Sequence, residues 1–564
     1  MTPDLLTMLI SLALCLAASS PVVVGAPWRN RRVMRLRGAA VRFADRWFFL
    51  CCAALMLLAL CLRTYRLTAL AASLSADEAF IAVNARFLFA TGRDMSGSLL
   101  PPFLKNAGST AYMGILTPLL TAPFISVLGM SSLAVRLPAV LLNLGALALM
   151  SALVCRACGR GGALLTLFAG AIAPWSYMAA RFATPAHALL LTLLLGAYLW
   201  AKSCDLGRPA FAYSGAFAFA LSMYTVDLAW LAAPLLMLGF VLYASVSRRF
   251  KASHGLGAFA LFAVLSLPAF CVAAVNLLDL DAFQFLFMRI ERFDAAPFLK
   301  RFFPLNGELN GVLSSMQQGF VACIGWLLLN VHADEFTPSG VWTLWNQDSA
   351  YAFSIPFLLV GGCSLGAWLR CRRRGAGVSL AFLMLPLALF LFFPAPDSQA
   401  LYVASAVIVM VSCIGMRQVA RKAPLSGLLV VALLVFTALP LAQSYFSDDY
   451  MDTTGDQYHP GLVDAVRHAQ ALSPDTLYMT KEIHPSVNPP LAAEAYARFA
   501  MDAPPGAEAG LEISYLPGLT PDPSARAAYV GRYDEFDAFD YEAYNFAEFG
   551  DYCVLTPISV YGER

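Results

Sequence analysis

The sequence predicts an all-α polytopic membrane protein with about 12 transmembrane helices, a re-entrant or juxtamembrane helix, and a small C-terminal extracytoplasmic α/β domain. Three observations support this fold class. The 564 residues are 59% hydrophobic and only 13% charged, a balance typical of membrane proteins. Apolar segments of about 20 residues alternate with short basic clusters. The charge is also divided, because residues 1–443 hold 16 acidic and 32 basic side chains whereas residues 444–564 hold 20 and 6.

The segment from Trp28 to Trp47 sets the orientation of the chain. It carries seven arginines and one acid, and such basic segments mark the cytoplasmic side. The first span lacks a basic N-terminal region, so we expect an uncleaved helix rather than a signal peptide. The remaining basic clusters all fall inside if the membrane is crossed at residues 4–25, 47–64, 131–154, 163–180, 184–201, 211–227, 229–247, 256–276, 351–369, 379–394, 400–416 and 426–443.

One apolar segment, residues 111–128, does not fit this alternation. It cannot cross if Asp77 lies outside and Arg156 lies inside, so we interpret it as re-entrant or as lying along the outer interface. Within the second outer loop, aromatic and cationic residues alternate over 283–303 and predict a helix in the headgroup layer. The acidic C-terminal region has a helix-like run at 462–471 and a strand-like run at 476–479, which predicts a small α/β domain.

These patterns divide the chain into three regions. Residues 1–46 form an extra N-terminal helix and a basic cytoplasmic loop, residues 47–443 form the membrane body, and residues 444–564 form the acidic domain. The membrane body has two outer loops, at 65–130 and 277–350. We therefore expect a multi-pass protein of the cell membrane whose C-terminal domain is extracytoplasmic.

The cysteines and short motifs exclude several kinds of site. Most of the 13 cysteines lie inside apolar segments, which is not the pattern of a secreted disulfide framework. Cys155 and Cys158 have CxxC spacing but lack a second pair or a nearby histidine, so ordinary membrane-boundary cysteines are the favoured reading. The sequence shows no metal-ligand constellation, no Gly-rich phosphate loop and no Ser-His-Asp arrangement.

Two adjacent acids, Asp77 and Glu78, follow the second apolar segment on the outer side. Charges at a membrane face are functional candidates by default. Asp77 could act as a general base toward a hydroxyl group, if partial burial or the like charge of Glu78 raises its pKa. The structural alternative is that Asp77 caps a helix beginning near Glu78. Both roles can hold together.

Several cations on the same side could bind a phosphate, because arginine offers a planar fork of donors. The alternative is that interfacial arginine and lysine side chains extend toward lipid headgroups, or have structural roles, as we favour for Arg136. His187, Asp227 and His332 are more simply explained as interfacial residues than as ligands. The candidate phosphate-binding residues are Lys105, Arg136, Arg181, Arg289 and Arg292.

A set of motifs in order along the chain resembles the GT-C superfamily of membrane glycosyltransferases, in the branch of the dolichyl-phosphate-mannose–protein mannosyltransferases and the aminoarabinose transferases. The resemblance covers roughly residues 47–445. Its motifs are Asp77-Glu78, Leu100-Pro101-Pro102-Phe103, Gly108-Ser109-Thr110-Ala111-Tyr112, Ala134-Val135-Arg136-Leu137-Pro138, Pro174-Trp175 with Arg181, and Trp345-Asn346-Gln347-Asp348.

The resemblance implies an enzyme that transfers a sugar from a polyprenyl-phosphate donor to an acceptor hydroxyl outside the cytoplasm. The reaction would invert the anomeric carbon, with Asp77 as the base beside Glu78. Tyr112 and Gln347, which lie in the motifs, join the candidate substrate-binding residues. Mannose is the default sugar of the branch, and the acceptor would be a protein, a lipid or a cell-wall glycan. No metal cofactor is indicated, and no nucleic acid is expected as a partner.

Two other classes of protein remain as alternatives. A transporter or flippase of lipid-linked saccharides usually has charged residues at mid-membrane and paired inverted repeats. Here the centres of the expected spans are nearly free of charge, and hydrophilic residues concentrate on one face, which favours an enzyme. A scaffold without activity is the third class, and it would survive if replacing Asp77 left glycan products unchanged.

Overall fold

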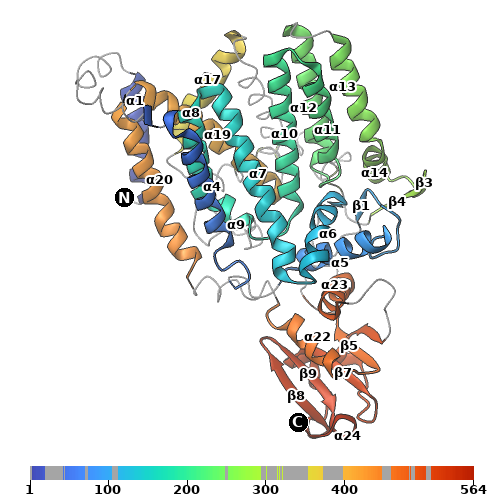
Figure 1. The fold of residues 1–564 in the computed structure, drawn as a ribbon. Coiled ribbons are helices and arrows are strands. Elements are labelled where there is room, and N and C mark those ends of the chain that lie inside the picture. The colour runs from blue at the N-terminus through green and yellow to red at the C-terminus, as the bar shows by residue number, and fades with distance from the viewer. Residues whose placement is uncertain are drawn as a thin grey trace.

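A helical bundle makes up most of the molecule, and a small sheet-containing domain lies at one end of it (Figure 1). In this computed structural model the description covers the following residues and a few isolated positions between them: 3–19, 45–69, 74–104, 112–247, 252–293, 354–371, 398–422, 424–447, 459–481, 489–502 and 510–563.

A helix lies over each expected membrane span except 379–394, which is outside the described residues. By length and apolar composition, α7, α10, α19 and α20 could each cross a membrane, and the bent pair α13–α14 would make a fifth span. Among the residues that the structure describes, these criteria support a membrane-embedded chain and do not confirm the 12 crossings that we expected. The helices of the bundle are α1 (Pro3–Ser19), α4 (Phe48–Thr64), α7 (Ser132–Cys158), α8 (Arg160–Ile172), α10 (Pro185–Leu206), α11 (Pro209–Ser222), α12 (Ala229–Ser247), α13 (Ala252–Leu265), α14 (Leu267–Leu277), α17 (Ile355–Cys371), α19 (Ser398–Lys422) and α20 (Pro424–Tyr445).

Two of the expected spans are broken at prolines. The span expected at 163–180 divides into α8 and the short α9 (Pro174–Ala179), and Ala173 between them is extended. Proline lacks an N–H and disfavours helical backbone at the residue before it, so Pro174 begins a new helix. At the second break, Pro268 is the second residue of α14, where a helix tolerates the missing N–H, and the axes of α13 and α14 differ by 62°.

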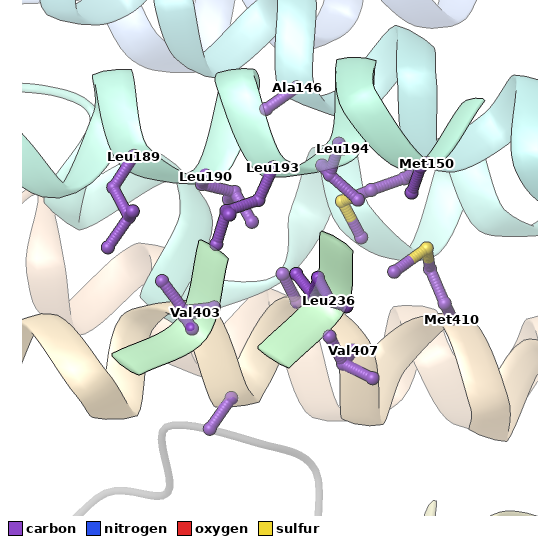
Figure 2. Packing of buried hydrophobic residues seen from close by; sticks show 14 of the residues in the cluster. Ala146, Met150, Leu189, Leu190, Leu193, Leu194, Leu236, Val403, Val407 and Met410 are labelled. Carbon is purple, nitrogen blue, oxygen red and sulfur yellow. The ribbon is translucent and has the colours of Figure 1, made fainter. Parts of the chain in front are cut away.

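The core of the bundle forms where α7, α10, α12 and α19 meet, through aliphatic side chains such as Met150, Leu193, Leu236 and Val407 (Figure 2). A neighbouring contact, between α17 and α19, depends on glycine. A Cβ atom on Gly415 would lie 1.9 Å from the Phe357 carbonyl oxygen, and one on Gly361 would lie 2.1 Å from that of Val411. Only glycine therefore lets these two backbones approach, as is common in membrane helix packing.

Helix α5 (Ala76–Thr91) lies across the end of the bundle, between it and the C-terminal domain (Figure 1). Strands β1 (Phe103–Leu104) and β2 (Met113–Gly114) form a two-stranded sheet, which α6 (Leu116–Leu128) follows in the chain. A helix of 13 residues is about 20 Å long, less than the roughly 30 Å of a hydrocarbon core. Helices α8 and α11, which lie over spans that we expect to cross, have 13 and 14 residues, so the interpretation that 111–128 does not cross stays a prediction.

We expected an interfacial helix over residues 283–303. This prediction is wrong for residues 283–290, which form a β-hairpin. Strands β3 (Phe283–Phe285) and β4 (Met288–Ile290) pair in antiparallel register. The aromatic residues alternate with a polar residue in β3, which is the period of a strand, and Leu286 takes a φ of 54° in the connecting turn. Asn276 of α14 then holds the segment after the hairpin, because its amide donates to the Glu291 carbonyl and accepts from Phe293 N.

The C-terminal region contains the α/β fold that its alternating pattern predicted. Its five-stranded mixed sheet has the order β6-β5-β7-β9-β8, in which β5 is parallel to both of its neighbours and the other pairs are antiparallel. Three short 3-10 turns connect these elements. The bounds are α22 (Leu462–Ala471), β5 (Thr476–Thr480), α23 (Pro489–Met501), β6 (Leu511–Ser514), β7 (Ala527–Arg532), β8 (Tyr544–Phe549), β9 (Tyr552–Pro557) and α24 (Ile558–Tyr561).

Both faces of this sheet are covered, and one of its cores extends to α5. In β7, Ala528 and Val530 belong to the core that includes α22 and α23, whereas Tyr529 belongs to a separate core on the other face. The first core also contains buried residues of α5, such as Phe80 and Val83. Helix α5 is therefore packed from two sides, by the bundle and by the C-terminal domain.

Candidate active site

Asp77 and Glu78 lie in the first turn of α5, and Ser75 is the residue that caps this helix. The Ser75 hydroxyl accepts from Glu78 N at 3.3 Å, and Glu78 Oε2 accepts from Ser75 N at 3.1 Å. This reciprocal pair is a capping box. The structural alternative, in which Asp77 caps the helix, is therefore wrong, because Ser75 occupies the N-cap and its hydroxyl accepts from Glu78 N.

Glu78 is fully buried and is bound by Arg136 of α7. The Arg136 Nε and Nη2 atoms donate to Glu78 Oε1 and Oε2, each at 3.0 Å. Ala183 N adds a third donor to Oε1, at 3.1 Å. Glu78 therefore fastens the start of α5 to α7 and to the segment after α9. A carboxylate with this many donors is suited to holding a structure in place rather than to accepting a substrate proton.

Arg136 is itself fully buried and makes two further contacts with the chain. Its Nη1 donates to the Leu67 carbonyl at 3.1 Å, and its guanidinium lies 5.5 Å from the centre of the Phe182 ring. This geometry favours the structural role for Arg136 over a role as a ligand of a lipid phosphate.

Arg181 is 2% exposed and binds the chain just after α4. Its Nη1 donates to the Tyr65 carbonyl at 2.6 Å, and its Nη2 donates to the Arg66 carbonyl at 2.7 Å. The guanidinium also lies over the rings of Tyr445 and Phe446, at 5.7 and 5.6 Å from their centres. It thus joins the ends of α4, α9 and α20, which favours the structural reading of this residue as well.

Tyr112 lies in an aromatic cluster under the first outer loop. It is 3% exposed, and its ring meets the edges of Trp230 and Phe293 at centroid distances of 5.5 and 4.9 Å. Phe103 completes the cluster, 5.0 Å from Trp230. Tyr112 therefore connects the first outer loop with α12 and with the segment that follows the β-hairpin.

Arg289 and Arg292 lie on or just after the β-hairpin and are exposed. Arg289 is 3.7 Å from Glu291, and Arg292 donates to Asp279 at 3.1 Å. Lys300 pairs with the same aspartate. The hairpin reaches the first outer loop, because the Ser98 hydroxyl donates to Glu291 at 3.2 Å. The other two candidate residues, Lys105 and Gln347, lie outside the described residues.

A buried polar network behind this region was not predicted from the sequence. Arg63 of α4 is fully buried and donates to Asn143 Oδ1 and Ser176 Oγ, each at 2.7 Å, and to main-chain carbonyls. The Asn143 amide donates to the Tyr402 hydroxyl at 2.6 Å, and His187 Nδ1 is 2.9 Å from the same oxygen. The acceptors of Arg63 in the described part of the chain are all neutral, so its charge is held without an acid.

Sequence signals for this network were weak. Arg63 is a cation within an apolar segment, which is a functional signal in itself, but it falls at the predicted end of a span. His187 was expected to be interfacial and is instead fully buried. No metal centre is visible in the described ranges, because no three His, Cys, Asp or Glu side chains gather there.

The contact between the membrane body and the C-terminal domain contains a cleft of about 260 Å³. Thr68, Leu74 and Ser131 line it from the membrane body, and Asp464 and Arg467 line it from the domain. Leu74, which lines the cleft, is three residues before Asp77. The cleft therefore lies close to the start of α5.

Comparison with known proteins gives matches at the level of structure. No protein-family model matches the chain, and no curated protein matches its sequence. ArnT from Cupriavidus metallidurans bound to undecaprenyl phosphate matches with a TM-score of 0.52 and 14% identity, over 91% of this chain and 98% of ArnT. Its apo state gives 0.50 and 14%, over 92% and 99%. The archaeal oligosaccharyltransferase AglB from Archaeoglobus fulgidus, in complex with an inhibitory peptide and a dolichol-phosphate, gives 0.49 and 13%, over 82% and 64%.

The likeness to ArnT covers nearly the whole of both chains. ArnT is a member of the GT-C superfamily. The GT-C resemblance that the motifs of residues 47–445 indicated is therefore confirmed at the level of the fold. The chain shares the fold of ArnT, with α5 and its two acids at the end of the bundle that contacts the C-terminal domain.

Proposed function

We propose that this protein transfers a sugar from a polyprenyl-phosphate donor to an acceptor hydroxyl on the extracytoplasmic face of the membrane. The observation that carries the proposal is the position of Asp77. It follows the cap of a helix at the end of a GT-C bundle, and the neighbouring acid, Glu78, is already bound by Arg136. The fold supports the donor class, because ArnT was crystallised with undecaprenyl phosphate.

In the proposed reaction Asp77 is the general base. Its carboxylate removes the proton of the acceptor hydroxyl while that oxygen attacks the anomeric carbon of the sugar. The bond between the anomeric carbon and the phosphate oxygen breaks, and the electron pair leaves with the lipid phosphate. Attack opposite to the leaving group inverts the anomeric configuration. The product is a glycosidic bond, with the proton on Asp77 and the lipid phosphate released.

Cations must stabilise the negative charge of the leaving phosphate. The burial of the candidate arginines indicates which of them could do so. Arg136 and Arg181 are buried with partners in the chain, whereas Arg289 and Arg292 are exposed at the β-hairpin. Exposed arginines can turn toward a phosphate more easily than buried ones. We propose the two hairpin arginines, together with Lys105, as the phosphate-binding group, and a hexose such as mannose as the sugar.

The test uses purified protein in vesicles that contain a labelled polyprenyl-phosphate sugar. We expect Asp77→Asn to lower the rate of transfer by about 10²- to 10⁴-fold, the usual contribution of a general base, with the unfolding temperature little changed. Asp522→Asn, which removes an exposed carboxylate of the C-terminal domain, is the matched control and should remain active.

Two outcomes would contradict the proposal. Normal transfer by Asp77→Asn would remove Asp77 as the base. Movement of the labelled donor across the bilayer, without any glycosylated product, would instead support a transporter of lipid-linked saccharides.

A further inference from the structure

One tyrosine of the C-terminal domain donates a hydrogen bond to the main chain that leads into α5. Tyr496 of α23 is fully buried, and its hydroxyl donates to the Leu74 carbonyl oxygen at 2.7 Å. Leu74 is 1% exposed and directly precedes Ser75, the cap of α5. The tyrosine therefore fixes the main chain three residues before Asp77.

The Tyr496 side chain is held by the core of its own domain. Its ring meets the His459 ring at a centroid distance of 5.6 Å, and His459 Nδ1 lies 3.1 Å from the Tyr552 hydroxyl. Burial, with added effects of Tyr552, Glu78 and Asp77, raises the pKa of Tyr496 well above its usual value. The phenol therefore stays protonated and remains a donor, and it is close enough to the two carboxylates to sense their charges.

Three sets of contacts hold the first turn of α5, each from a different part of the chain. The Ser75–Glu78 capping box acts within the helix, and Arg136 and Ala183 bind Glu78 from the bundle. Tyr496 supplies the third contact, from the domain. Without the phenol, the buried Leu74 carbonyl would lose this donor and the turn would be free to shift toward another one.

We infer that Tyr496 is a positioning residue for Asp77, so that the C-terminal domain is a working part of the candidate active site. The inference rests on the proposed function. By binding the Leu74 carbonyl, Tyr496 fixes the orientation of the first turn of α5 and therefore of the Asp77 side chain. A displacement of about 1 Å in a reacting group can lower a rate by up to about a hundredfold, so one hydrogen bond at this position affects catalysis.

The experiment compares the wild-type chain with Tyr496→Phe, which keeps the buried ring and removes only the hydroxyl. With the full-length protein in vesicles, we expect kcat to fall by about 10- to 100-fold. The KM values for donor and acceptor should stay within about twofold, because Tyr496 is not placed to bind either substrate.

Two control variants separate positioning from simple attachment of the domain. Tyr529→Phe removes the hydroxyl of a buried tyrosine that lies in the separate core on the other face of the domain's sheet. Asp502→Asn breaks the ion pair with Arg86, which joins the same domain to α5 farther along the helix. Both should keep kcat near the wild-type value, at an unfolding temperature similar to that of Tyr496→Phe.

The outcomes distinguish this inference from the proposed function. Equal kcat values for Tyr496→Phe and the two controls would overturn the positioning role, even if Asp77→Asn were inactive. A wild-type chain that transfers no sugar would overturn both. A selective loss of kcat in Tyr496→Phe, with both KM values kept, would support the inference.

Discussion

Glu78 and Arg136 form an ion pair in which neither side chain is exposed to solvent, and the pair joins two helices across 58 residues of sequence. Taking two charges out of water is costly, and their attraction offsets this cost only while both are present. The stability of the α5 start therefore depends on the pair as a unit.

The first prediction follows from this dependence. Arg136→Met should lower the free energy of unfolding by about 3–5 kcal/mol, because it leaves Glu78 buried without its counter-charge. The double variant Glu78→Gln/Arg136→Met should recover much of that loss, since no charge is then buried alone and the amide oxygen can still accept from Ala183 N. Unfolding in detergent, followed by tryptophan fluorescence, measures both. Losses that simply add in the double variant would contradict the coupling.

Replacing Arg181 tests whether this residue has a structural role or binds the phosphate of the donor. Arg181→Lys should lower the free energy of unfolding by about 1–3 kcal/mol, because an ammonium group cannot hold two carbonyls and stack on two rings as the guanidinium does. The KM for the donor should stay the same. Arg292→Lys, at an exposed arginine, is the control and should leave stability unchanged. A higher donor KM for Arg181→Lys at unchanged stability would instead identify a phosphate ligand.

Asp94, in the loop after α5, should make stability depend on pH. Burial raises its pKa from 3.8 to about 6, against a lowering effect of the hydrogen bond from Ser98 N, and the charge of Glu291 adds to the rise. Between these pH values the folded chain keeps a proton that the unfolded chain releases. The free energy of unfolding therefore falls as the pH rises through this window, because ionised Asp94 is buried.

Replacing Asp94 removes this pH effect. Asp94→Asn should match the wild type near pH 4 and unfold at a higher temperature than the wild type at pH 7. Asp522→Asn should instead unfold at a lower temperature than the wild type by a nearly constant amount from pH 4 to pH 7.5, because hydrogen bonds from Ser524 lower the pKa of Asp522 from 3.8 and its ionised form stabilises the fold throughout this range. Thermal unfolding in detergent between pH 4 and pH 7.5 measures both variants. Parallel curves for wild type and Asp94→Asn would show that the prediction is wrong.

Gly415 should be the most sensitive position of the α17–α19 contact. Gly415→Val should separate the two helices and lower the free energy of unfolding by about 3 kcal/mol or more, since its Cβ would lie 1.9 Å from the Phe357 carbonyl oxygen. Gly366→Val is the matched control, because no atom of the described chain lies within 4 Å of a Cβ built there. Equal stability of the two variants, measured by thermal unfolding in detergent, would contradict this packing.

The helical part of the fold could be predicted because the bilayer imposes long apolar segments and a side for basic residues. Sequence patterns predict the structure less well where polar and aromatic residues mix. At Phe283–Ile290 the arginines suggested an interfacial helix, but the alternation of Phe283, Gln284 and Phe285 is the period of a strand. The breaks at Pro174 and Pro268 were visible in the sequence and were not used.

Part of the candidate site was visible in the sequence and part was not. Asp77 and Glu78 were found because two adjacent acids are conspicuous beside an apolar segment. Their different environments were not predictable, because the partner of Glu78 is an arginine 58 residues away with no local signal of pairing. The cap was misassigned to Asp77, although Ser75 followed by Glu78 at the third position is a capping-box pattern.

Helix α5 shares one core with the C-terminal domain, and this has a consequence for the order in which the molecule assembles. Leu74 and its donor Tyr496 are 422 residues apart. At about 5–20 residues per second, a ribosome needs roughly 20–80 s to make the chain between them. During that time the face of α5 that will meet α23 has no partner from the domain. The packing around the helix that carries the two acids is thus completed only after α23 has been synthesised.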